Sequence, residues 1–151
     1  MELLNLLNKL ESNIDNFEME NTSVSKSTVG WQIDHTLRVV NGVITQVKIS
    51  NPDEYKSSFN FKRFVVFSIN KIPRGKARAP KSVQATGIIN KSELISQIEI
   101  AKKLVSEVYN FNEKSNFKHH YFGVLNLKQC IKFLEIHTNH HLKIIDDVLK
   151  K

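Results

Sequence analysis

Four stretches of the chain repeat apolar residues every three or four positions, with polar side chains between them. This spacing puts the apolar residues on one face of an α-helix, so it predicts four amphipathic helices. The apolar stripes are, in chain order, Leu3, Leu7, Leu10, Ile14 and Phe17; Ile33, Leu37, Val40, Ile44 and Val47; Leu94, Ile98, Ala101, Val105 and Val108; and Cys130, Phe133, Leu134, Ile144, Ile145 and Val148.

Capping and helix-breaking residues set the expected ends of these helices. The second helix should begin near residues 27–30 and run to about Ile49, because Pro52 cannot continue a helix and disfavours α geometry in the residue before it. The fourth lies within Leu127 to Leu149. The third and fourth helices each follow a capping residue, which is Asn90 or Ser92 for the third and Asn126 for the fourth.

Three connecting segments complete the predicted fold. Phe59 to Ile69 is aromatic and β-branched, and we expect a short helix there because no second strand-like run lies nearby to pair with it. Ile72 to Thr86 predicts a long crossover loop, and such loops are often functional. His119 to Asn126 is expected to form a compact turn. The predicted fold is an all-α four-helix bundle, a single domain over residues 1–151, with the crossover between its second and third helices.

Composition narrows the function classes. The chain has 151 residues, is 40% hydrophobic and carries a net charge of +7, with five basic residues from Lys71 to Lys81. We interpret the basic bias as solvation of a loop and of helix exteriors, so nucleic acid is not expected as a partner. The lone Cys130 excludes an internal disulfide and fits a reducing compartment. Because no signal peptide or run of ~18 apolar residues is present, we expect a cytoplasmic protein without a membrane partner. A homodimer is compatible with the sequence.

Two histidines stand out in the fourth stretch. His137 and His141 lie four residues apart, in the middle of the apolar face, and His140 lies at its edge. Burial of an unpaired polar group costs roughly 1–3 kcal/mol, so a partner is expected. A divalent metal ion is the partner that suits this spacing best. Phosphate-binding glycine loops and nucleophile elbows are absent from the sequence, which disfavours nucleotide and serine-hydrolase chemistry.

An open metal site generally takes a third protein ligand. Cys130 shares the helical face but lies about 10 Å along the axis from His137, and His140 points about 60° away from its neighbour. His35 in the second helix is the best remaining donor. It lies on the opposite side of the helical wheel from the Ile33 stripe, so the wheel alone does not place it beside the pair. The full set of candidates is His35, His119, His120, His140 and Cys130.

Four motifs in this order resemble the DUF1569 family of the DinB-like superfamily of bacterial four-helix-bundle proteins. An aromatic residue and a histidine occupy Trp31 to His35, a prolyl-basic crossover runs from Ile72 to Lys81, a turn similar to HPxFG spans His119 to Gly123, and an HxxHH motif spans His137 to His141. The resemblance covers nearly the whole chain. It departs from the family at His120, which occupies the proline position of the turn.

The resemblance implies a divalent metal, nickel or zinc, held by His35, His137 and His141. Three neutral imidazoles leave an open position for a water whose pKa falls to about 7, or for a thiol bound as thiolate. An open site of this kind suits a metal-dependent hydrolase, and the resemblance implies a transferase that uses a low-molecular-weight thiol; either would act on a small-molecule substrate. A stress-related or binding protein with a structural or vestigial metal site is the alternative. Charge alone suggests that Arg74, Lys76 and Arg78 bind an anionic ligand.

The remaining candidates have structural interpretations. His140 is expected to lie beside the ligands or at the surface, and His119 to hydrogen-bond the turn. Packing roles are expected for four further residues, Trp31, Tyr121, Phe122 and Cys130.

Overall fold

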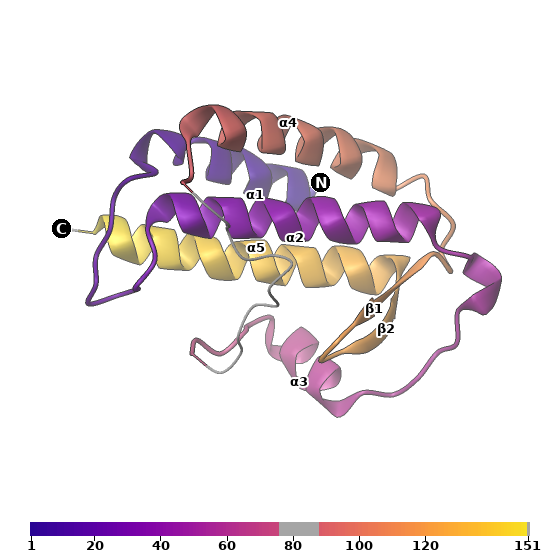
Figure 1. Ribbon diagram of the computed structural model, residues 1–151. Coiled ribbons are helices and arrows are strands. Elements are labelled where there is room, and N and C mark those ends of the chain that lie inside the picture. The colour runs from indigo at the N-terminus through magenta and orange to yellow at the C-terminus, as the bar shows by residue number, and fades with distance from the viewer. Residues whose placement is uncertain (76–87, 151) are drawn as a thin grey trace.

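The computed structural model describes residues 1–75 and 88–150 (Figure 1). The described chain is mostly helical, as predicted, and it also contains one small two-stranded sheet. None of its helices combines the length and the apolar character needed to cross a bilayer. The elements are α1 (Glu2–Glu11), α2 (Val29–Ile49), α3 (Phe61–Ile69), α4 (Lys91–Val108), β1 (Asn116–His119), β2 (Gly123–Asn126) and α5 (Leu127–Leu149), with 3₁₀ turns at Ile14–Asn16 and Pro52–Glu54.

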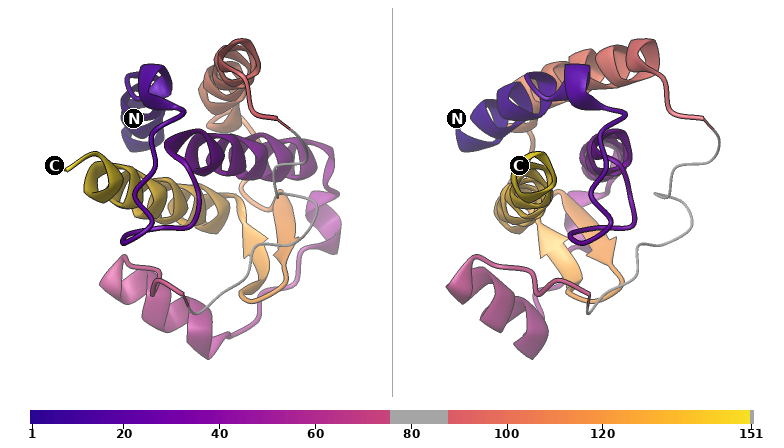
Figure 2. Two further views of the ribbon diagram at one scale, coloured as in Figure 1. Left: turned by 60° about the vertical axis from the view of Figure 1, so that its left-hand side comes forward. Right: turned by 90° about the vertical axis from the view of Figure 1, so that its left-hand side faces the viewer.

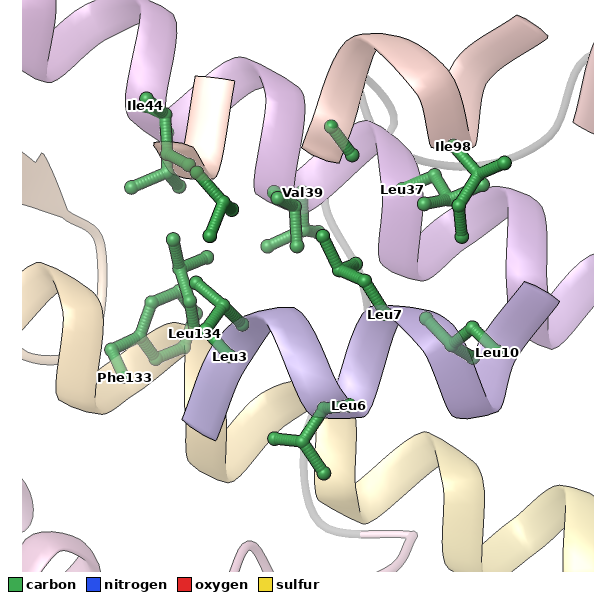
Figure 3. Packing of buried hydrophobic residues seen from close by; sticks show 14 of the residues in the cluster. Leu3, Leu6, Leu7, Leu10, Leu37, Val39, Ile44, Ile98, Phe133 and Leu134 are labelled. Carbon is green, nitrogen blue, oxygen red and sulfur yellow. The ribbon is translucent and has the colours of Figure 1, made fainter. Parts of the chain in front are cut away.

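Four of the helices pack in two layers around one hydrophobic core. Helices α1 and α4 form one layer and α2 and α5 the other, while α3 and the β-hairpin lie on the far side of α2 and α5 (Figures 1 and 2). Each of the four packs against two others, α2 against α4 and α5, and α1 against α4 and α5. Figure 3 shows apolar side chains gathered between these helices, among them Leu3, Leu7, Leu10, Leu37, Ile44, Ile98 and Leu134.

Helix α1 is shorter than its apolar stripe predicts. The stripe continues through Ile14 to Phe17, but the helix ends at Glu11 and Ile14–Asn16 form a separate 3₁₀ turn. The side chains of Ser12 and Asn13 donate hydrogen bonds to the carbonyl oxygen of Lys9, at 2.9 and 2.8 Å. Such local side-chain bonds compete with the next turn of a helix, so the chain changes direction while Ile14 stays buried.

The predicted extents of the other long helices are confirmed. Helix α2 runs from Val29 to Ile49, and a short helix, α3, forms between residues 61 and 69 as expected. Asn90 caps α4. Asn126 caps α5 within a reciprocal capping box, in which the Gln129 side chain accepts from the Asn126 backbone N–H. Most of the predicted crossover loop, including Lys76 and Arg78, lies outside the described residues.

The segment expected to be a compact turn is part of a β-hairpin. Strands β1 and β2 pair antiparallel, with His119 opposite Gly123. Gly123 has a φ of 71°, a conformation that glycine adopts without strain. The buried guanidinium of Arg63 in α3 donates hydrogen bonds to the carbonyl oxygens of Phe122 and Val124 in this hairpin. These bonds connect α3 to the hairpin, which itself packs against α2 and α5.

Candidate metal centre

Helix α2 has two buried faces, one packed in the hydrophobic core and one directed toward the histidines of α5. Ile33, Leu37 and Val40 are fully buried in the core between the helix layers. His35, on another side of the helix, faces the histidines of α5. Two apolar arcs on one helix predict such burial, and the second arc is the one that brings His35 toward the histidines of α5.

Three histidines converge between α2 and α5. His35 comes from α2, and His137 and His141 come from successive turns of α5. Each offers a donor atom within 4.8 Å of the others. The ring centroid of His35 lies 5.2 Å from that of His137 and 4.8 Å from that of His141. The three residues are only 4, 9 and 7% exposed, so they form a buried cluster that could hold a metal ion.

The charge state of the cluster suits a metal. Burial, reinforced by the neighbouring imidazoles, lowers the pKa of His137 well below its usual 6.5, and burial with the nearby His35 does the same for His141. Both rings are therefore neutral near pH 7 and present lone pairs. Neutral imidazole is a preferred donor for zinc and nickel.

One buried nitrogen of the cluster has no hydrogen-bond partner. Within the described residues the Nδ1 atom of His137 is fully enclosed and bonds to nothing. An unsatisfied buried polar atom costs about 1–3 kcal/mol. Coordination of an ion by Nδ1 itself would offset this cost, so the donor set and its unsatisfied atom both fit a divalent metal.

Gln32 orients the third imidazole. Its Oε1 atom lies 2.6 Å from Nδ1 of His141 and its Nε2 atom lies 3.2 Å from Oγ of Ser25. Because an amide oxygen only accepts, Nδ1 of His141 carries the proton and Nε2 carries the lone pair. Histidine ligands commonly have such a partner, which fixes tautomer and ring orientation. Sequence reasoning missed this role, although a polar residue three positions before His35 on a buried helix is a visible signal.

The other predicted residues surround the cluster. Trp31 stacks on His35, with ring centroids 5.1 Å apart and planes 10° apart. His140 is half-buried and packs edge-on against His141, at 5.1 Å between centroids. His119 accepts hydrogen bonds through Nδ1 from the backbone N–H groups of Tyr121 and Phe122, as predicted for the turn. Burial lowers the pKa of His119 to about 4.

Cys130 lies outside the cluster, as its position on α5 predicts. Its thiol is buried and donates to the carbonyl oxygen of Leu125 at 3.4 Å. Burial raises the pKa of Cys130 to about 12. Cys130 is not part of the cluster that could hold an ion, and a thiol with this pKa is not a nucleophile at neutral pH, so Cys130 is a packing residue.

A cavity of about 510 Å³ opens onto the histidine cluster. All three clustered histidines line it, together with residues of α2, α5, the hairpin and the segment after α3. The apolar walls are formed by Trp31, Val39, Val43, Phe117, Phe122 and Phe133. An ion in the cluster would therefore face a space large enough for a small molecule.

Arg74, predicted to bind an anion, lies beside a second and smaller cavity. This cavity of about 240 Å³ is lined by Arg74, Lys71, Lys143 and His140, among others. The Arg74 guanidinium forms an ion pair with Asp147 at 2.8 Å. Arg74 does not line the larger cavity, and the two partners predicted for it, Lys76 and Arg78, fall outside the described part of the chain.

Comparison with known proteins gives no family assignment, since no family model, curated protein or solved structure matches the chain. The interpretation of the site therefore rests on its own geometry and on the sequence motifs.

Proposed function

We propose that this protein is a metal-dependent enzyme that binds a divalent ion through His35, His137 and His141 and acts on a small molecule as a thiol transferase or a hydrolase. The observation that carries the proposal is the convergence of three buried imidazoles, with donor atoms within 4.8 Å, on a cavity of about 510 Å³. The motif resemblance to the DUF1569 family of DinB-like four-helix bundles supports it and favours nickel or zinc.

The residues around the cluster have defined parts in this function. His35, His137 and His141 would hold a divalent ion with at least one position open, and such an ion would supply the chemistry that activates water or binds a thiol as thiolate. Gln32 holds the His141 ring with Nε2 available, and Trp31 holds the His35 ring by stacking. Phe117, Phe122 and Phe133 give the cavity an apolar wall that limits the access of bulk water. A small-molecule thiol or substrate is the partner that such a cavity suits.

The position of the cavity favours a catalytic ion over a structural one. Structural zinc sites are closed by four protein ligands, whereas catalytic sites keep a position for substrate. Among the described residues, the cluster that could hold an ion has three donors, all of which line the cavity. The hydrophobic core that packs α1, α2, α4 and α5 together involves none of these histidines, so the fold has support that does not depend on an ion.

Chelation of the metal-loaded protein tests this distinction. We expect the chelated protein to keep its helical circular-dichroism spectrum and cooperative thermal unfolding, and to recover the ion on addition of zinc or nickel. Cobalt-loaded protein should change its visible absorption when 2-mercaptoethanol is added, because the thiol enters the open position. Loss of the fold on chelation would favour the alternative of a structural ion, and an unchanged cobalt spectrum would argue against an open position.

A further inference from the structure

The larger cavity extends along one side of helix α2. His35, Val39, Gly42, Val43 and Gln46 all line it, and their spacing of three or four residues puts them on one side of the helix. From His35 to Gly42 the helix rises about 10 Å. Gly42 and Gln46 are exposed, whereas His35, Val39 and Val43 are buried. The cavity therefore has a buried end at the histidine cluster and an open end near Gly42, and it also meets the surface at Pro73, Gly75, His120 and Tyr121.

Little charge faces this cavity. Apart from histidines, Arg38 is the one charged residue among the described lining residues, and neither Asp nor Glu occurs there. The Arg38 guanidinium is already bonded to Asp34 at 2.7 Å, a contact that raises its pKa further. Apolar and aromatic side chains from α2, the hairpin and α5 form most of the wall. Within the described part of the lining, an ion held by the three histidines would be the one strong site for negative charge.

We propose that the substrate carries a single anionic donor, a thiolate or a carboxylate, followed by an unbranched or aromatic apolar body about 10 Å long that lies along α2 toward Gly42. This inference rests on the proposed metal site and adds the chemical class of the ligand. A thiol with several charged groups fits poorly, because those groups would lose water against Val39, Val43 and the phenylalanines without gaining partners.

Affinities of n-alkanethiols for the cobalt-loaded protein test the proposal. Each buried methylene should tighten binding by about fourfold, from ethanethiol upward, until the chain fills the cavity and the gain stops. Binding is followed by the change in visible absorption of the cobalt ion. Glutathione, which presents a thiol together with several charges, serves as the polar comparison. We expect it to bind at least tenfold more weakly than the longest alkanethiol in the rising part of the series.

Two substitutions shorten the cavity from different positions. Gly42→Trp adds a large side chain at the open end, where a Cβ atom meets nothing within 4 Å. Val39→Phe fills the buried middle. Both should stop the gain in affinity at a shorter alkanethiol while ethanethiol binds as before. Thr45→Trp is the matched control, because Thr45 is exposed on the same helix and does not line the cavity.

The outcomes separate the two proposals. Failure of the wild-type protein to take up cobalt would overturn the proposed function, and the proposed ligand class would fail with it because no ion would bind the anionic donor. Normal cobalt uptake with equal affinities along the alkanethiol series, or with glutathione bound as tightly, would overturn the ligand class alone. If Gly42→Trp and Val39→Phe both leave the affinities along the series unchanged, the apolar body of the ligand does not lie along α2.

Discussion

Helix α2 presents two buried faces with opposite consequences for the protein. The face with Ile33, Leu37 and Val40 is apolar, fully buried and packed against other helices. The face with His35, Val39 and Gly42 borders a cavity, and the buried imidazole of His35 on this face lies close to two further histidines. The first face packs into the core, and the second lines the cavity and carries one of the three histidines that could hold a metal ion. Substitutions on the two faces should therefore separate folding from metal binding.

Leu37→Ala should have the largest effect on folding. Leu37 is fully buried, and removal of a buried leucine side chain costs about 2–5 kcal/mol, because the cavity that it leaves collapses only in part. Urea unfolding measures this loss. Zinc affinity of the folded variant should stay within a fewfold of the wild type, and a large drop in affinity would show that the two faces are not independent.

Gln32→Leu should lower the metal affinity and leave the free energy of unfolding nearly unchanged. The variant removes the acceptor for Nδ1–H of His141, and loss of such a supporting contact typically lowers metal affinity by about 10–100-fold. Competition with a chromogenic chelator gives the affinity. Thr36→Val, a change of another buried polar residue on α2 that donates to a backbone oxygen, should leave it nearly unchanged. Equal affinities for wild type and Gln32→Leu would remove Gln32 from the site.

Acid should lower the free energy of unfolding of the metal-free protein. Burial holds the pKa values of His137 and His141 well below 6.5 and that of His119 at about 4, whereas an unfolded histidine titrates near 6.5. The unfolded chain thus binds more protons below pH 6.5, and stability that is complete above that pH is lost as the pH falls. Urea unfolding of the apo-protein at pH 7.5, 6.5 and 5.5 measures the slope. His137→Leu/His141→Leu should flatten it, and a flat wild-type profile would contradict the assignment of neutral, buried rings.

Gly42 should give the smallest effect on the cavity face, and Gly30, which lies elsewhere on α2 against Phe17, gives the contrast. Gly42→Ala should stabilise the protein by about 0.5–1 kcal/mol, because alanine is the better helix former and its Cβ meets nothing within 4 Å. Gly30→Ala should destabilise it instead, since a Cβ there would lie 2.8 Å from the backbone oxygen of Phe17. Thermal unfolding of the two variants measures both shifts. Destabilisation by Gly42→Ala would mean that the cavity rim is tighter than described.

Sequence periodicity predicted the extents of the long helices α2, α4 and α5 better than the end of α1 or the β-hairpin. The extents of α2, α4 and α5 followed from apolar spacing and from caps such as Asn126, which are local properties of the chain. The first helix was extended too far, because the stripe through Ile14 continues while Ser12 and Asn13 turn the backbone. The hairpin was missed because its strands are only four residues each, which is too short to show a clear alternation of apolar and polar residues.

The histidine cluster was only partly visible in the sequence. Spacing alone identified His137 and His141 as one face of one helix. The place of His35 depends on how α2 is rotated against α5, and this rotation is set by packing of the whole core, which no local pattern encodes. Gln32 has the same dependence, since its bond to His141 joins residues 109 positions apart.

The metal content of the protein, purified without a histidine tag and incubated with zinc or nickel, shows whether His35, His137 and His141 form a metal site. We expect close to one ion per chain for the wild type and for His120→Ala, which removes an exposed histidine, and little or none for His35→Ala and for His141→Ala. A wild type without bound metal, or a His35→Ala variant that retains as much metal as the wild type, would contradict a site built from these three histidines.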